Sequence, residues 1–113
     1  MSSSRAVRNP RMREQGRIRT SGSAAARTDV IEWQNAVNVI AVEAADGDLV
    51  GGFLLAVRAL TSRSREAELV QIRSRAFERL RANGWSLPRI GAAAGYHHTT
   101  VLHHLERLAQ EET

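Results

Sequence analysis

Apolar residues in this chain recur every three or four positions over most of its length, a spacing typical of amphipathic α-helices. Three stretches show it before residue 84: VIEWQNAVNVIAVEAA from Val30, LVGGFLLAVRAL from Leu49, and REAELVQIRSRAFERLRAN from Arg65. No stretch alternates apolar and polar residues as a half-buried β-strand would, and no hairpin turn is evident. We therefore predict an all-α fold: a small domain of four to five helices that ends in a helix-turn-helix and follows a disordered basic N-terminal arm.

Local sequence signals suggest where these helices begin and which of them is buried. Thr28 and Asp29 form a good N-cap pair for the first helix, and Ser62 or Ser64 is expected to cap the third. The stretch 49–60 is apolar nearly all round, so we expect it to form a buried central helix. The aromatic side chains predicted to lie in the core are Trp33, Phe53, Phe77 and Trp85.

The positive charge is concentrated at the N-terminus. Residues 1–28 contain seven arginines and one acid, a formal charge of +6, whereas the remainder contains nine arginines and eleven acids, or −2. The first segment has too few apolar side chains to offset the entropy lost on ordering, so we interpret 1–28 as a disordered Arg-rich arm. Such an arm either follows DNA phosphates or serves only as a solubilising tail. Residues 29–63 are interpreted as a helical hairpin able to form a dimer interface, and 64–113 as a helix followed by the helix-turn-helix region described below.

The composition excludes several classes of site. The chain has no cysteine, which rules out disulfides, thiolate zinc sites and cysteine nucleophiles. All sixteen basic residues are arginines, whose forked guanidinium group suits phosphate and guanine. The longest apolar run, 49–57, has nine residues, whereas a bilayer span needs roughly 20. We therefore expect a cytoplasmic protein that has no membrane partner.

The segment SLPRIGAAAGYHHTTVLHHLERL, residues 86–108, has the layout of a helix-turn-helix. Ser86 can cap the first helix of the pair, and Gly95 falls where the chain must turn sharply and tolerates a positive φ. The predicted inner stripe of the second helix consists of Val101, Leu105 and Leu108.

The same segment resembles the helix-turn-helix of resolvases and of many bacterial and phage repressors. In that pattern a small residue is followed after three positions by glycine and later by Thr-Val. Gly91, Gly95, Thr100 and Val101 stand at those places.

The stretches SLPRIG and HTTVLHHL further resemble the C-terminal DNA-binding domain of bacterial replication initiators. The resemblance implies DNA contacts for Leu87, Pro88, His98 and Thr99, with Thr100 as a further candidate. The spacer here is one residue shorter, and Tyr96-His97 replace the family's Arg-Asp, so the base preference does not carry over. The GxxxxGK phosphate loop of the initiators' ATPase portion is also absent from this chain.

If Val101 and Leu105 point inward, the polar positions of the second helix point outward, where a recognition helix meets the major groove. The resulting DNA-binding candidates are Leu87, Pro88, Arg89, His97, His98, Thr99, Thr100, Leu102 and His103. Further phosphate contacts are expected from Arg75, Arg79 or Arg81.

The four histidines also raise the question of a metal site. His97 and His104 are seven residues apart and could share a helix face, but the HExxH pair of metalloproteases is absent. We expect neither metal nor other cofactor, and His104 is as readily a boundary histidine packed against the body. A helical chain of this length shows no evident catalytic pocket, so we predict that it is not an enzyme.

These features together predict a sequence-specific protein that binds double-stranded DNA. The expected role is transcriptional regulation in a bacterium, phage or plasmid, with association with the nucleoid. The alternatives are a helix-turn-helix-shaped protein-interaction module, or a replication or partition factor. A homodimer fits both DNA binding and protein docking, because the helices between Asp29 and Thr61 are apolar and Gly51-Gly52 would let partner helices approach.

Overall fold

The computed structural model describes residues 25–111, which form five α-helices and no β-strand. The helices are α1 (Arg27–Ala44), α2 (Leu49–Thr61), α3 (Ala67–Ala82), α4 (Leu87–Ala94) and α5 (His98–Glu111). The all-α prediction is therefore confirmed over this range. The predicted basic arm lies outside the described residues except for its last four, of which Arg27 and Thr28 already belong to α1.

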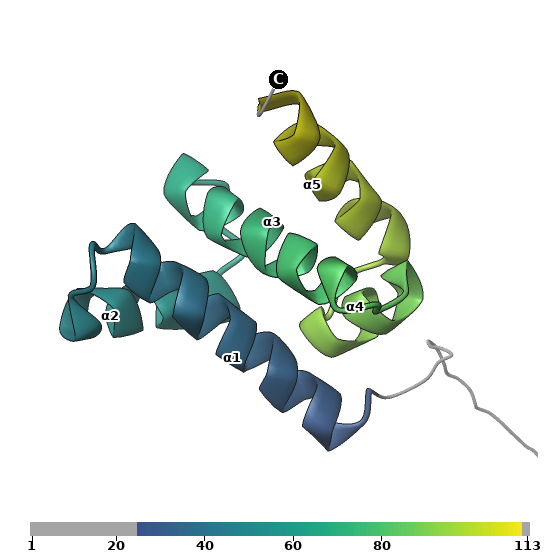
Figure 1. The fold of residues 1–113 in the computed structure, drawn as a ribbon, viewed down its shortest axis with the longest axis horizontal. Coiled ribbons are helices and arrows are strands. Elements are labelled where there is room, and N and C mark those ends of the chain that lie inside the picture. Colours follow the sequence, from purple (N-terminus) through teal and green to yellow (C-terminus); the bar gives the residue numbers. More distant parts are fainter. Residues whose placement is uncertain (1–24, 112–113) are drawn as a thin grey trace, which may run out of the picture.

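Helix α3 is the central element of the fold (Figure 1). α1 and α5 pack on either side of it in this view, and α4 lies near its C-terminal end. α2 folds back along α1 and also contacts α3, whereas α5 contacts α3 and α4. Within residues 25–111, α2 and α5 share no contact, so these two helices expose separate surfaces.

The core is built around Phe77 of α3, which is fully buried. Trp33 of α1 stacks on its ring with 5.0 Å between centroids, and Tyr96, which precedes α5, meets it edge-on at 5.9 Å. Such aromatic pairs add to the stabilisation that burial alone provides. The predicted core positions of Trp33, Phe77 and Trp85 are confirmed. The other large side chains that are fully buried are Leu69, Ile72, Leu80, Ile90, Leu108, Val37 and Val101.

The prediction that α2 is a buried central helix is wrong. Its buried side consists of the small residues Gly52, Ala56 and Ala59. A Cβ atom added at Gly52 would lie 2.7 Å from Cα of Val42, so α1 occupies the space beside this glycine. The close helix approach expected at Gly51-Gly52 is therefore made within one chain at Gly52. With its small side turned inward, α2 leaves most of its large apolar side chains outside, although Leu55 and Leu60 are partly buried. Phe53 is 62% exposed, where the sequence analysis placed it in the core.

The expected N-caps of α1 and α3 are also wrong. α1 begins at Arg27 after Ala26, and the Asp29 carboxylate binds Arg89 of α4 instead of a main-chain amide. α3 begins at Ala67 after Glu66. Ser62 and Ser64 order the preceding linker instead: the Ser62 hydroxyl accepts from the Ser64 amide at 2.9 Å, and the Ser64 hydroxyl accepts from the Glu66 amide at 3.2 Å.

A buried arginine fixes the junction between α2 and α3. Arg73 is 3% exposed and donates to three main-chain carbonyls, those of Ala59, Ser62 and Ser64, at 2.5–2.9 Å. The positive guanidinium group thus meets the C-terminal end of α2, where unpaired helix carbonyls favour a cation. Arg73 thus ties the linker 62–66 to α3.

Candidate nucleic-acid interface

Helix α4 begins as the sequence predicts. Ser86 is its N-cap, and the Ser86 hydroxyl accepts a hydrogen bond from the Arg89 amide at 3.2 Å. Pro88 lies in the first turn, where a missing N–H leaves no helix hydrogen bond unmade. The side chain of Leu87 is half-buried, and Pro88 is exposed.

The turn between α4 and α5 depends on two glycines. Gly95 has φ 81° and ψ 29°, the left-handed conformation that ends many helices and that glycine adopts without strain. The amides of Gly95 and Tyr96 both donate to the Gly91 carbonyl at 2.8 Å. A Cβ atom at Gly91 would lie 2.4 Å from the Tyr96 carbonyl oxygen, so the chain folds back directly over this glycine. The predicted sharp turn at Gly95 is confirmed.

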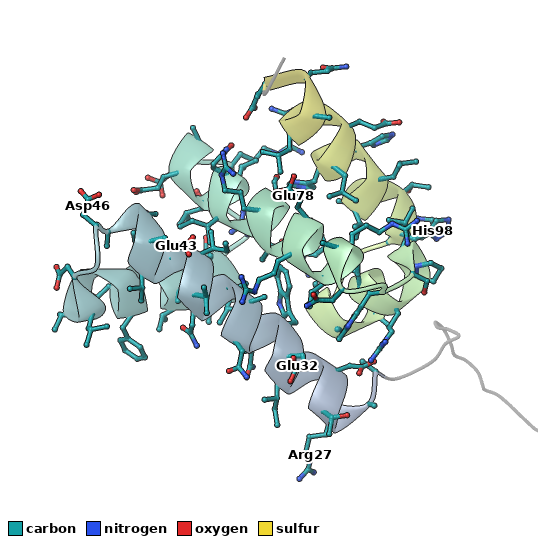
Figure 2. The ribbon with its side chains drawn as sticks, in the orientation of Figure 1. Arg27, Glu32, Glu43, Asp46, Glu78 and His98 are labelled. Atoms are coloured by element: carbon teal, nitrogen blue, oxygen red, sulfur yellow. The ribbon has the colours of Figure 1, made fainter. Side chains whose placement is uncertain are left out.

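Helix α5 has an apolar inner side and a polar outer side. Val101 and Leu108 are buried against the body, and Leu105 is partly buried beside them. The predicted DNA-binding side chains of this region that are exposed are His97, His98, Thr99, Leu102 and His103, whereas Thr100 is partly buried. In Figure 2, His98 marks the start of this helix, at the edge of the molecule. A row of donors, acceptors and one apolar side chain is thus open to a partner along the first two turns of α5.

The side chain of His97 forms the cap of α5. The Thr99 amide donates to Nδ1 of His97 at 3.2 Å, and the Thr99 hydroxyl lies 2.8 Å from the same nitrogen. Because an amide can only donate, Nδ1 of His97 is the acceptor of this hydrogen bond. His97 therefore satisfies one of the unpaired amides at the helix start and orients Thr99.

Arg89 is engaged within the chain. Its Nε and Nη2 atoms each donate to the Asp29 carboxylate at 3.0 Å, and its guanidinium lies 3.8 Å from the centre of the Trp85 ring. The hydrogen bond from Arg89 lowers the pKa of Asp29 below its ordinary value, and the same bond raises the pKa of Arg89. This ion pair ties α4 to α1. Arg81, another predicted phosphate contact, donates to the Trp85 carbonyl at 2.8 Å.

A basic groove runs beside the outer side of α5. It has a volume of about 820 Å³ and lies between α5 and the linker and first turns of α3. Thr100 and His103 of α5 are among its lining residues, so the groove adjoins the predicted recognition surface. Among residues 25–111, Glu111 is the one acid that lines it. The arginines that line it are Arg63, Arg65, Arg73 and Arg107.

The linker and the helix-turn-helix are joined across this groove. The Arg63 guanidinium lies 4.5 Å from the centre of the Tyr96 ring and donates to the Gly95 carbonyl at 3.3 Å. A cation over an aromatic face is attracted by the electron-rich ring. The turn of the motif is therefore braced by a residue that lies 32 positions earlier in the chain.

His104 lies at the inner wall of the groove and is half-buried. Its Nδ1 atom is 2.8 Å from the Ser74 hydroxyl, and its ring meets Phe77 edge-on at 5.3 Å. Burial, followed by the positive charges of Arg107 and Arg73, lowers the pKa of His104 below its ordinary value. This residue is the boundary histidine that the sequence analysis considered.

A metal site and a membrane span were each searched for in the described part of the chain. Among residues 25–111, no group of three histidines or acids comes together to hold a metal ion. No helix in this range is both long enough and apolar enough to cross a bilayer.

Sequence reasoning missed the arginines of the groove. Arg107 stands one helical turn after His103, so its position beside the predicted recognition surface could have been inferred from the helical period. Arg63 and Arg65 belong to the α2–α3 linker, and only the tertiary fold places that linker across the groove from α5.

Comparison of the chain with protein-family models, with curated proteins and with solved structures found no match in any of the three.

Proposed function

We propose that this protein binds double-stranded DNA through the helix-turn-helix formed by α4 and α5, and that it regulates transcription in a bacterium, phage or plasmid. The observation that carries the proposal is the exposed polar side of α5 beside a groove that the exposed arginines Arg65 and Arg107 line. A recognition helix needs these two features together, because base edges are read by short polar side chains and phosphates are held by cations.

The side chains divide into two roles under this proposal. His98, Thr99 and His103 face base edges, with Leu102 placed to meet a thymine methyl group. Arg65 and Arg107 bind phosphates along the groove and supply affinity without sequence preference. His97 acts indirectly, because it holds Thr99 at the helix start.

The proposal is tested with a selected duplex. The full chain is incubated with a pool of duplexes carrying a random centre, and the affinities of the enriched duplex and a scrambled duplex are compared by fluorescence anisotropy at several salt concentrations. Thr99→Ala and His103→Ala should each reduce the preference for the enriched duplex by about 1–3 kcal/mol per base contact. Arg107→Ala should weaken binding to both duplexes equally and reduce the salt slope by about one.

Arg27→Ala is the matched control, because it removes the same charge from the start of α1, and Arg27 does not line the groove. Equal losses for Arg27→Ala and Arg107→Ala would mean that only net charge matters, which contradicts the assigned surface. The protein-interaction alternative would be favoured if no duplex is enriched from the pool and the chain instead captures a protein partner whose binding does not weaken with added salt.

The N-terminal arm and a homodimer extend the same proposal. Removing residues 1–24 leaves α1 intact and should flatten the salt dependence while keeping the preferred site. A homodimer would present two α5 helices to half-sites about 34 Å apart. DNA binding also implies association with the nucleoid in the cytoplasm.

A further inference from the structure

Helix α2 carries an exposed apolar face that the helix-turn-helix does not use. The exposed fractions of its side chains range from 38% to 72%. They belong to Leu49, Val50, Phe53, Leu54 and Val57, which together are called the α2 face.

These five side chains share one side of the helix. They occupy positions i, i+1, i+4, i+5 and i+8, which are neighbours on a helix surface. The opposite side is formed by Gly52, Ala56 and Ala59 and is already packed against the protein's own helices. No charged residue lies between Asp48 and Arg58, so the α2 face offers no ion pair to a partner. Whatever covers it must therefore be apolar itself.

The size of the α2 face fits a dimer. Its exposed fractions amount to about three fully exposed side chains, or roughly 500 Å² if each offers on the order of 170 Å². That is near the upper end of the apolar patches found on monomeric proteins, roughly 300–600 Å². Two such faces together would remove roughly 1,000 Å² from water, about the smallest total area of a specific interface.

We propose that the α2 face is covered by the same face of a second copy of this chain, forming a symmetric dimer. An isologous interface needs a surface that complements itself, and an uncharged apolar face meets that requirement. The chain's own residues 1–24 are an unsuitable cover, because they are rich in arginine and serine. A lipid surface is also unsuitable. Helices that lie on membranes are rich in unpaired basic residues, whereas here Asp48 precedes the α2 face and Arg58, which follows it, is paired with Glu66.

The dimer leaves the DNA-binding surface free. α2 contacts α1 and α3, whereas α5 contacts α3 and α4. In Figure 2, Asp46 in the turn before α2 and His98 at the start of α5 lie at opposite sides of the molecule. The use of the dimer in reading two half-sites rests on the proposed function, whereas the dimer itself does not.

The test measures the molar mass of the full chain in solution without DNA, by light scattering after size exclusion and by sedimentation over a wide range of concentration. The wild-type chain should have twice the mass of one chain, and Phe53→Glu and Leu54→Glu should have the mass of one. Phe53→Ala, which adds no charge, should raise the dissociation constant at least about tenfold. Ile31→Glu is the matched control, because Ile31 is an exposed apolar residue of α1, 46% exposed, and should leave the dimer intact.

Each other result overturns the proposal. A wild-type chain that stays monomeric at all concentrations has no such dimer, and binding of that monomer to lipid vesicles would assign the α2 face to a membrane. A dimer that survives both Phe53→Glu and Leu54→Glu, or that Ile31→Glu disrupts equally, uses another surface. Circular dichroism of each variant separates loss of the dimer from loss of the fold. Since no DNA is present, the outcome is independent of the test of the proposed function.

Discussion

Replacing Gly91 by alanine should destabilise the helix-turn-helix by overfilling the space under its turn. The added Cβ would lie 2.4 Å from the Tyr96 carbonyl oxygen and 3.3 Å from the His98 amide nitrogen. Ordinary contacts between non-bonded atoms are about 3.5–4.0 Å, so the overlap with the carbonyl oxygen is about 1 Å. Both neighbours are main-chain atoms, so the clash cannot be relieved by rotating a side chain.

The expected magnitude follows from two opposing effects. Overpacking of this kind costs about 1–3 kcal/mol, and a clash with main chain belongs at the upper end of that range. Alanine in place of glycine within a helix returns about 1 kcal/mol. We therefore expect a net loss of about 2 kcal/mol in the free energy of unfolding, which for a domain of this size lowers the melting temperature by about 10 °C.

Gly51→Ala is the matched control for this prediction. Its Cβ would come closest to Oδ2 of Asp48 at 2.7 Å, the far end of an exposed side chain that can rotate away. Here the helix preference for alanine should dominate, and the variant should be up to about 1 kcal/mol more stable than the wild type. The measurement is urea and thermal unfolding followed by circular dichroism at one protein concentration. Equal stability of Gly91→Ala and the wild type, or a shift of the same sign in both variants, would refute the argument from main-chain crowding.

Three further changes test other parts of the structure. Arg73→Met should lower the free energy of unfolding by about 1–3 kcal/mol, because three main-chain carbonyls lose their donor. Urea unfolding measures this change. A variant as stable as the wild type would show that the guanidinium group is dispensable. The neutral form of His104 is favoured in the folded protein, so the stability it contributes is present above the ordinary pKa of 6.5 and is lost as pH falls through its lower folded pKa. His104→Gln should therefore reduce the fall in stability below that pH, and an unchanged pH profile would contradict the assigned burial. Arg89→Ala should weaken DNA binding less than Arg107→Ala in the anisotropy assay, because Asp29 already binds the Arg89 guanidinium. A larger loss of DNA affinity for Arg89→Ala would show that this ion pair opens when DNA binds.

The sequence by itself determined the parts of the fold that depend on near neighbours. The helical period, the Ser86 cap and the left-handed turn at Gly95 each involve residues within a few positions of one another, and all three are present. The inward position of Val101 and Leu108 follows from the same period. Local sequence signals suffice here because the backbone hydrogen bonds that they govern close within one or two helical turns.

Tertiary structure alone decided which side of α2 is buried and which arginines lie beside α5. A helix that is apolar all round has no preferred side in its own sequence, and the small side was selected because α1 can approach Gly52 closely. Arg63 and Arg65 reach the surface beside α5 because Arg73 holds their linker in place, whereas Arg89 is drawn to Asp29, 60 positions away. Contacts of this range depend on how whole helices pack, and no pattern confined to a few neighbouring residues encodes them.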